Sequence, residues 1–87
     1  MTYRLVVAPG AVRQLAEELP EKAAWACYEF VTGPLLDQPR RVGAPLRGKF
    51  EGLFRARRGE YRVRYRIDDD AGAVIVLDVS HRKDAYR

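Results

Sequence analysis

The segment Tyr61-Arg62-Val63-Arg64-Tyr65-Arg66-Ile67 alternates apolar or aromatic side chains with arginines without a break. Successive side chains of a β-strand point to opposite faces of the sheet, so this alternation predicts a strand with one buried face and one solvated, cationic face. Arg58-Gly59-Glu60 is typical of a tight turn, and it joins this strand to a second predicted strand at Leu53–Arg58. An arginine-rich antiparallel pair is therefore the starting point of the fold.

Two further strands are predicted outside this pair. The turn Asp68-Asp69-Asp70-Ala71-Gly72, which its aspartates stabilise, leads into Val74 to Val79. That run is apolar nearly throughout, as expected of a strand that is central in a sheet or buried on both faces. Near the start of the chain, Tyr3 to Ala8 is rich in β-branched and aromatic residues and stops at Pro9-Gly10, which predicts a short first strand.

Apolar residues recur at helical spacing between the first strand and the arginine-rich pair. A first amphipathic helix is predicted from Pro9 to Pro20, with an apolar stripe of Val12, Leu15, Ala16 and Leu19. A second helix begins at Pro20-Glu21, is interrupted or kinked at Gly33-Pro34, and has a stripe of Ala24, Cys27, Tyr28, Val31 and Leu35. Residues 37–45 hold Pro39, Gly43 and Pro45, which predict a surface connection back to the sheet.

This order of elements predicts one α+β domain over residues 1–87, with the order β-α-α-β-β-β. The two helices form a hairpin packed on one face of a mostly antiparallel four-stranded sheet. If the apolar side chains of residues 61–67 face the helices, Arg62, Arg64 and Arg66 lie on the open face. We therefore expect a basic, concave surface there.

Composition limits the classes of function. Sixteen Lys and Arg against twelve Asp and Glu give a net charge of +4, which favours an acidic partner such as nucleic acid. Lys22, Lys49 and Lys83 are the only lysines, so the positive charge is mainly guanidinium. Cys27 is the single cysteine, which excludes an internal disulfide and suits a small core residue. No apolar run approaches the roughly 20 residues of a membrane span, so we expect a soluble, cytoplasmic protein without a membrane partner.

Two groups of residues are candidates for chemistry. Arg55, Arg57 and Arg58 bring further guanidiniums within a few cross-strand spacings, about 5 Å each, of the alternating segment. A polyanion would relieve their mutual repulsion, although charge can also simply protect a strand edge from aggregation. At the other end, His81 could exchange protons near neutral pH, or it could be a surface or packing residue. Tyr86 could stack on a base or donate its phenolic proton, or it could cover the core.

Neither a metal centre nor a nucleotide cofactor is expected. One histidine, one cysteine and the aspartate turn supply no convergent ligands at a recognisable spacing, and no Gly-rich loop lies between a strand and a helix. RNA carries its own nucleophile, the 2′-hydroxyl. An enzyme can cleave it by aligning that group with the phosphate and stabilising the added negative charge, a task for which arginines suffice.

In order along the chain, several short motifs resemble the landmarks of the RelE/ParE toxin superfamily. They are Leu46-Arg47-Gly48, Gly52-Leu53, Arg55, Gly59, the alternating segment 61–67, and His81-Arg82-Lys83-Asp84-Ala85-Tyr86. RelE-like members cleave the codon presented in the ribosomal decoding site, and a co-expressed antitoxin wraps and blocks them. The resemblance implies that this chain is a type II toxin that cuts messenger RNA on the ribosome without a metal, with a RelB-like or similar cognate antitoxin.

The resemblance also implies roles for individual residues. Arg62 and Arg82 match arginines associated with phosphate and transition-state stabilisation, and Tyr86 falls near a tyrosine that orients the substrate base. The founding member has two lysines where this chain has Leu53 and Arg55; arginine holds its proton too tightly to be an easy general base, so Arg55 is expected to act electrostatically. His81 and Glu51 remain as proton-transfer candidates. Contacts with RNA are expected from Arg57, Arg64, Arg66, Lys49 and Lys83.

Two other functions remain open at this point. A ParE-type toxin of the same architecture inhibits DNA gyrase by protein contact and has no nuclease activity. The domain could also be a plain nucleic-acid binder, or an inactive toxin relic that only forms complexes. In each toxin reading we expect an antitoxin whose amphipathic, acid-containing tail lies over the helices and reaches the arginines of the sheet.

Overall fold

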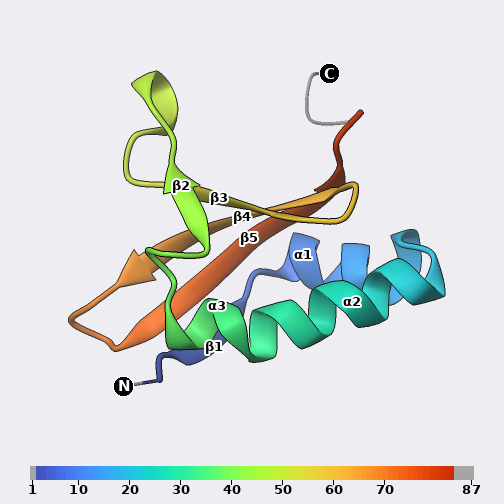
Figure 1. Ribbon diagram of the computed structural model, residues 1–87, viewed down its shortest axis with the longest axis horizontal. Helices are drawn as coiled ribbons and strands as arrows, with labels where there is room; N and C mark the ends of the chain where they lie inside the picture. Colours follow the sequence, from blue (N-terminus) through green and yellow to red (C-terminus); the bar gives the residue numbers. More distant parts are fainter. Residues whose placement is uncertain (1, 84–87) are drawn as a thin grey trace.

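A mixed five-stranded sheet organises the computed structural model, which describes residues 2–83 (Figure 1). The strands are β1 (Arg4–Val7), β2 (Gly43–Pro45), β3 (Phe54–Arg58), β4 (Tyr61–Asp68) and β5 (Ala73–His81), in the spatial order β1-β5-β4-β3-β2. β1 runs parallel to β5, and the other three pairings are antiparallel. The α+β class and the mostly antiparallel sheet are confirmed, and β5 is an interior strand that lies between β1 and β4.

The sheet has one strand more than predicted, because part of the expected surface connection is a strand. Gly43–Pro45 pairs antiparallel with Phe54, Arg55 and Ala56 of β3. Pro45 is tolerated because β2 is an edge strand, where a missing N–H costs no ladder bond. The buried Tyr65 fixes the loop that precedes β2, because its hydroxyl donates a hydrogen bond to the carbonyl of Pro39. The predicted number of four strands was therefore wrong, because the prediction missed this short edge strand.

The helices that precede β2 in the chain all cover one face of the sheet (Figure 1). α1 (Pro9–Arg13) continues into a π-helical turn, η1 (Gln14–Glu18), and α2 (Glu21–Thr32) is followed by the short α3 (Pro34–Asp37). The interruption predicted at Gly33-Pro34 is confirmed. No helix within residues 2–83 combines the length and apolar character that crossing a bilayer requires.

The core lies between this helical layer and the sheet, and it confirms the predicted phase of β4. Val63 and Tyr65 are fully buried, as are Leu35 and, at 1% exposure, Cys27. Burial raises the pKa of the Cys27 thiol, consistent with its predicted role as a small core residue. The odd-numbered residues of β4 thus face the helices, and its arginines face away.

A β-bulge changes the phase of β5 midway along the strand. Tyr65 pairs with Val76 but Arg64 pairs with Asp78, so Leu77 has no partner on β4. Val76 and Val79 are consequently both buried on the helical side, although they are three residues apart. Because of the bulge, Asp78 and Ser80 point to the open face. Without it, the alternation that starts at Val76 would continue, and Val79 and His81 would point to the open face instead.

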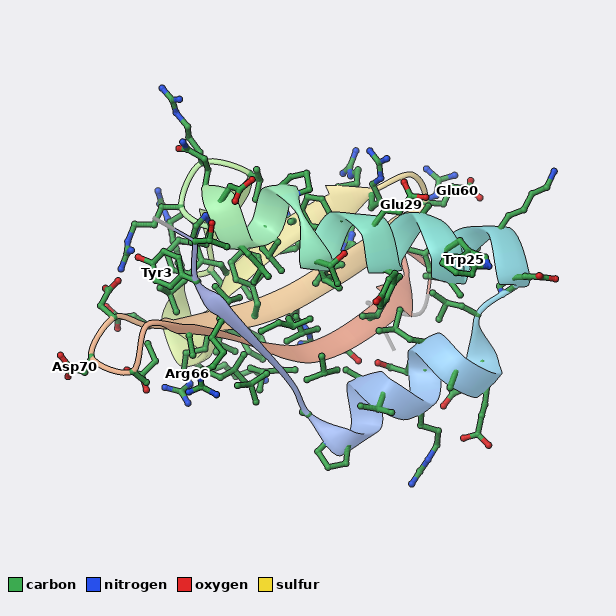
Figure 2. All side chains as sticks on the ribbon, turned by 90° about the horizontal axis from the view of Figure 1, so that it is seen from below. Tyr3, Trp25, Glu29, Glu60, Arg66 and Asp70 are labelled. Carbon is green, nitrogen blue, oxygen red and sulfur yellow. The ribbon has the colours of Figure 1, made fainter. Side chains whose placement is uncertain are left out.

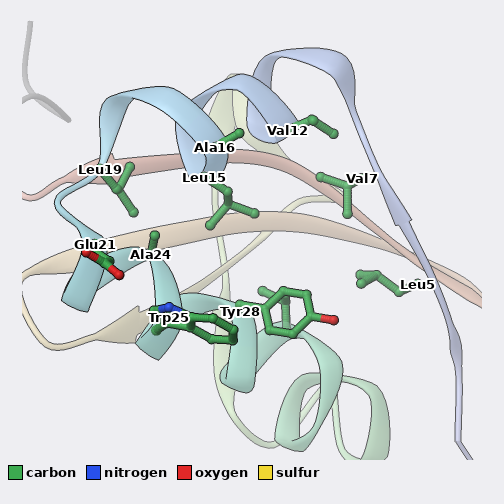
Figure 3. A pocket seen from close by; sticks show the side chains of 11 residues that line it. Leu5, Val7, Val12, Leu15, Ala16, Leu19, Glu21, Ala24, Trp25 and Tyr28 are labelled. Carbon is green, nitrogen blue, oxygen red and sulfur yellow. The ribbon is translucent and has the colours of Figure 1, made fainter.

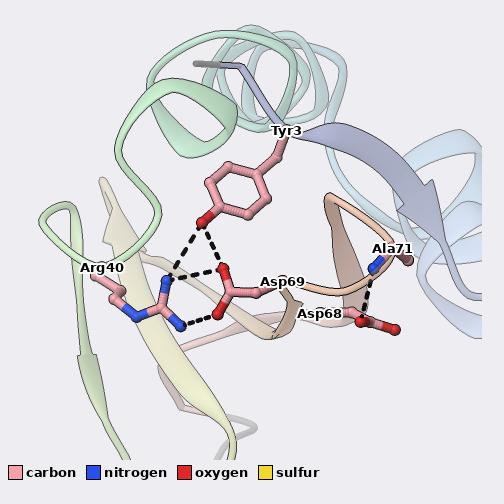
Figure 4. A network of polar contacts seen from close by, with 5 residues as sticks. All are labelled: Tyr3, Arg40, Asp68, Asp69 and Ala71. Atoms are coloured by element: carbon pink, nitrogen blue, oxygen red, sulfur yellow. Dashed lines mark hydrogen bonds and ion pairs between the residues drawn. The ribbon is translucent and has the colours of Figure 1, made fainter.

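The turn between β4 and β5 is held by its aspartates, as predicted. Asp68 Oδ1 accepts a hydrogen bond from the Ala71 amide at 3.1 Å. Asp69 binds Arg40 through both carboxylate oxygens, at 3.3 and 2.6 Å, and accepts the Tyr3 hydroxyl at 2.7 Å (Figure 4). The guanidinium and the hydroxyl lower the pKa of Asp69. This network joins the residue that precedes β1, the loop before β2 and the β4–β5 turn.

Candidate functional site

The open face of the sheet carries two cross-strand rows of polar side chains. One row runs from Arg57 on β3 through Arg62 on β4 to Ser80 on β5. The second row, one pleat further along, consists of Arg55, Arg64 and Asp78. Partners in a row share a face and are about 5 Å apart, so four guanidiniums share one patch. We call the patch formed by Arg55, Arg57, Arg62 and Arg64 the arginine face.

Asp78 accepts several hydrogen bonds in the second row, through both of its carboxylate oxygens. Its Oδ2 accepts hydrogen bonds from Arg64 Nε and Nη2, at 3.2 and 3.1 Å, and from Ser80 Oγ at 3.1 Å. Its Oδ1 accepts from Gln14 Nε2 at 2.8 Å, and Gln14 Oε1 in turn accepts the Val79 amide at 2.7 Å. Asp78 was not among the predicted site residues. The available signal was one acid inside an otherwise apolar strand, opposite an arginine.

Two other predicted RNA contacts lie at the margins of the arginine face. Arg66 points to the same side of the sheet but lies opposite Ile75, toward the β4–β5 turn. Figure 2 shows Arg66 and Asp70 toward one end of the molecule and Glu60 toward the other. Lys49 lies on a 3₁₀ turn, η2 (Gly48–Phe50), which rises on the open side of the sheet (Figure 1). Glu51 directly follows this turn, and its amide donates to Gly48 O at 3.0 Å.

His81 lies on the opposite side of the sheet from the arginine face. It pairs with Tyr61, whose ring it meets edge to face at 5.2 Å between centroids. Its Nδ1 accepts the Lys83 amide at 3.1 Å, so the proton of the neutral ring belongs on Nε2, which lies 3.5 Å from Glu60 Oε2. Both ring nitrogens therefore have partners. The structure does not bring His81 together with the arginines of the sheet, because the bulge at Leu77 places its side chain on the opposite side.

Arg82 shares the carboxylate of Glu60 with His81. Its Nη2 lies 3.6 Å from Glu60 Oε1, and its amide donates to Glu60 O at 2.8 Å. Residues 82–83, which directly follow β5, lie on the open side of the sheet, opposite the helices (Figure 1). Arg58, in contrast, pairs with Tyr61 and thus points to the helical side. Lys83 follows Arg82, and Tyr86 lies outside the described residues.

The helical side carries an exposed apolar groove of about 610 Å³ between β1, the α1–η1 segment and α2 (Figure 3). Trp25, Tyr28 and Val12 line it and are 59%, 53% and 49% exposed. The rings of Trp25 and Tyr28 meet edge to face at 5.9 Å. Val12 and Tyr28 belong to the predicted apolar stripes, but they line this groove instead of being buried. Contiguous exposed apolar surface of this kind marks an interaction site.

No group of three or more His, Cys, Asp or Glu side chains within the described part of the chain is arranged to hold a metal ion. The carboxylates of Asp78 and Glu60 are each engaged with an arginine side chain. The site is thus dominated by guanidiniums. Chemically, it can bind phosphate groups and stabilise negative charge that develops on them.

Comparison with known proteins gives consistent similarities over nearly the whole chain. Residues 10–86 match the family model of the ParE toxin of the type II toxin-antitoxin system parDE. The chain is 49% identical over 85 residues to Toxin RelE of Mycobacterium tuberculosis, covering 98% of this chain and 87% of that protein. It is 46% identical over 87 residues to Toxin RelG of the same organism, covering 100% and 99%. The crystal structure of the RelBE2 toxin-antitoxin complex from Mycobacterium tuberculosis is similar with a TM-score of 0.90 and 44% identity, covering 94% of this chain and 100% of that one.

Proposed function

Because the chain belongs to the RelE/ParE toxin family of type II toxin-antitoxin systems, we propose that it is a ribosome-dependent messenger RNA endonuclease that arrests translation and is neutralised by a cognate antitoxin. The observation that carries the proposal is the arginine face, where cross-strand pairing aligns Arg57 with Arg62 and Arg55 with Arg64. A surface of this kind suits a ribose-phosphate backbone better than a neutral ligand. The names of the two relatives, Toxin RelE and Toxin RelG, favour the same reading.

The proposed reaction uses the substrate's own 2′-hydroxyl. Its oxygen attacks the adjacent phosphorus, the bond to the 5′-oxygen of the next nucleotide breaks, and the proton of the 2′-hydroxyl is lost while the leaving oxygen gains one. Arg62 and Arg82 are proposed to stabilise the negative charge that builds up on the phosphoryl oxygens. Arg55 contributes to the same electrostatic field and does not exchange protons, since guanidinium keeps its charge.

The remaining cations are proposed to bind the RNA backbone. Arg57 and Arg64 belong to the arginine face, and Arg66, Lys49 and Lys83 would contact the strand on either side of the cut. His81 is proposed to act indirectly, because its engaged Nδ1 and Nε2 hold the Lys83 amide and Glu60. Glu60 in turn holds Arg82, so this group would orient Arg82 toward the phosphate.

The apolar groove on the helical side is proposed as the antitoxin site. One relative was solved as a toxin-antitoxin complex, and the exposed Trp25, Tyr28 and Val12 need an apolar cover. An amphipathic antitoxin segment would lay its apolar side chains in the groove, and acidic residues further along would reach the arginine face. Binding the folded toxin alone would raise its thermal stability.

The alternative function is gyrase inhibition without nuclease activity. The matched family model is described for the ParE toxin, and that observation keeps the alternative open. Two assays on purified protein separate the readings. Incubation with ribosomes and a defined messenger should give cuts within the codon in the decoding site, while a DNA gyrase supercoiling assay should be unaffected. Inhibited supercoiling with an intact messenger would replace the proposal by its alternative.

A further inference from the structure

Phe50 places an exposed aromatic ring beside the arginine face. It is the last residue of η2, the turn that joins β2 to β3 on the open side of the sheet (Figure 1). Its side chain is 40% exposed. Lys49 Nζ lies 5.3 Å from the centroid of its ring, and Arg64 Cζ lies 6.0 Å from the same centroid. A flat apolar surface thus lies close to an ammonium and a guanidinium of the candidate site.

A purely structural role does not account for this arrangement. An aromatic ring normally gains its stabilisation by burial, as the partly buried Phe54 of β3 does when it stacks on the buried Tyr65 at 5.6 Å. Phe50 is only partly buried, so it gains less stabilisation from burial, and part of its ring surface stays in contact with water. Cation–π contacts at exposed sites are weak, so they do not explain the exposure of this ring.

A nucleotide suits both features of this site, the exposed ring and the cations beside it. Unpaired bases stack on exposed aromatic rings, and the phosphates on either side pair with cations. Arg64 also belongs to the row of the arginine face next to Arg62, so a nucleotide on the ring would be close to a linkage held by Arg62. An acidic protein segment would pair with the two cations but would gain little from the exposed part of the ring.

We propose that Phe50 is the stacking platform for one unpaired nucleobase of the bound RNA, with Lys49 and Arg64 holding the adjoining phosphates. This inference rests on the proposed function and adds a residue that positions one nucleotide near the cut. Because stacking tolerates any flat base, the platform requires an aromatic side chain and not a particular hydrogen-bonding group.

The test compares Phe50→Leu with Phe50→Trp in the ribosome-dependent cleavage assay. Phe50→Leu keeps apolar volume but removes the flat face, so cleavage at subsaturating ribosome concentration should fall about tenfold or more, the scale of losing one base-stacking contact. Phe50→Trp should retain cleavage within about twofold, because an indole also stacks. Urea unfolding of both variants verifies that they are folded. Equal cleavage by the wild type and Phe50→Leu would overturn the inference and leave the proposed function standing.

A second readout does not depend on cleavage. The indole introduced by Phe50→Trp should be quenched by a short single-stranded oligoribonucleotide made uncleavable by 2′-O-methyl groups, and an abasic version should quench much less. The wild type, whose Trp25 lies on the helical side, gives the background signal. Quenching here with no cleavage by the wild type would support the platform and contradict the proposed function. Absence of quenching would contradict the stacking role of Phe50. A tenfold loss of antitoxin affinity in Phe50→Leu, with cleavage unchanged, would also contradict it.

Discussion

The guanidinium of Arg64 and the carboxylate of Asp78 face each other across β4 and β5, with Nη2 3.1 Å from Oδ2. This ion pair lies within the second row of the arginine face and offsets one positive charge there. Repulsion among the guanidiniums is reduced, and the side chain of Arg64 is fixed before any ligand binds. The carboxylate also ties the sheet to Gln14 of η1, so the candidate site and the helical layer are connected.

Replacing Asp78 should therefore destabilise the fold. Asp78→Asn removes a charge-assisted hydrogen bond from Arg64 and leaves donors without an acceptor in a site where the aspartate is only 21% exposed. We expect the free energy of unfolding to fall by about 1–3 kcal/mol, measured by urea denaturation. The matched control Asp70→Asn changes an exposed turn residue and should leave stability within about 0.5 kcal/mol of the wild type. Equal stability of the two variants would contradict the role given to Asp78.

Gly43 should be intolerant of even a methyl group. A Cβ there would overlap Tyr65 Oη and come within 2.8 Å of the Arg55 carbonyl oxygen. Gly43→Ala should therefore reduce the free energy of unfolding by about 1–3 kcal/mol. In the control Gly10→Ala the new Cβ meets nothing within 4 Å, and the helical position should make that variant as stable as the wild type or slightly more stable. A Gly43→Ala protein as stable as the control would show that β2 is not packed as described.

The phenol of Tyr65 should lose its proton at a higher pH than an ordinary tyrosine does, because its pKa is raised. Burial raises its pKa from 10.0 to about 12, because the phenolate would be desolvated. The unfolded chain loses this proton at lower pH than the folded chain, so stability is full below pH 10 and declines as the pH rises toward about 12. Phenolate absorbance against pH should show a late-titrating group that is absent in Tyr65→Phe. Identical titration curves for the two proteins would contradict the burial of this phenol.

The apolar groove should control inhibition by the antitoxin. Trp25→Ser removes the most exposed aromatic ring of the groove, and truncating such an anchor costs about 2 kcal/mol, roughly 30-fold in affinity. The antitoxin concentration that halves each variant's own cleavage rate should rise accordingly. Glu18→Ser, an exposed change outside the groove lining, serves as the control. Unchanged inhibition of Trp25→Ser would mean that the antitoxin binds elsewhere.

The arginine face was predictable because a strand has a fixed period of two, and the strict alternation of residues 61–67 allows only one phase. Two features had no such signal. β2 is formed by residues rich in breakers, and it is held by pairing with β3 and by the hydrogen bond from Tyr65 to Pro39, neither of which is visible locally. The bulge at Leu77 depends on pairing with β4, and it decides that Asp78 joins the arginines while His81 does not.

The most direct test of the RNA-cleaving arginine face is cleavage of a defined messenger on purified ribosomes, with 5′ ends mapped for the wild type, Arg62→Ala and Arg55→Ala. Each substitution should lower the rate about 100-fold or more, as expected when a group that stabilises transition-state charge is removed. Arg13→Ala removes the same charge from an exposed position on α1 and should cleave like the wild type. Cleavage by Arg62→Ala and Arg55→Ala at the wild-type rate, or a messenger left whole by the wild type, would contradict this account.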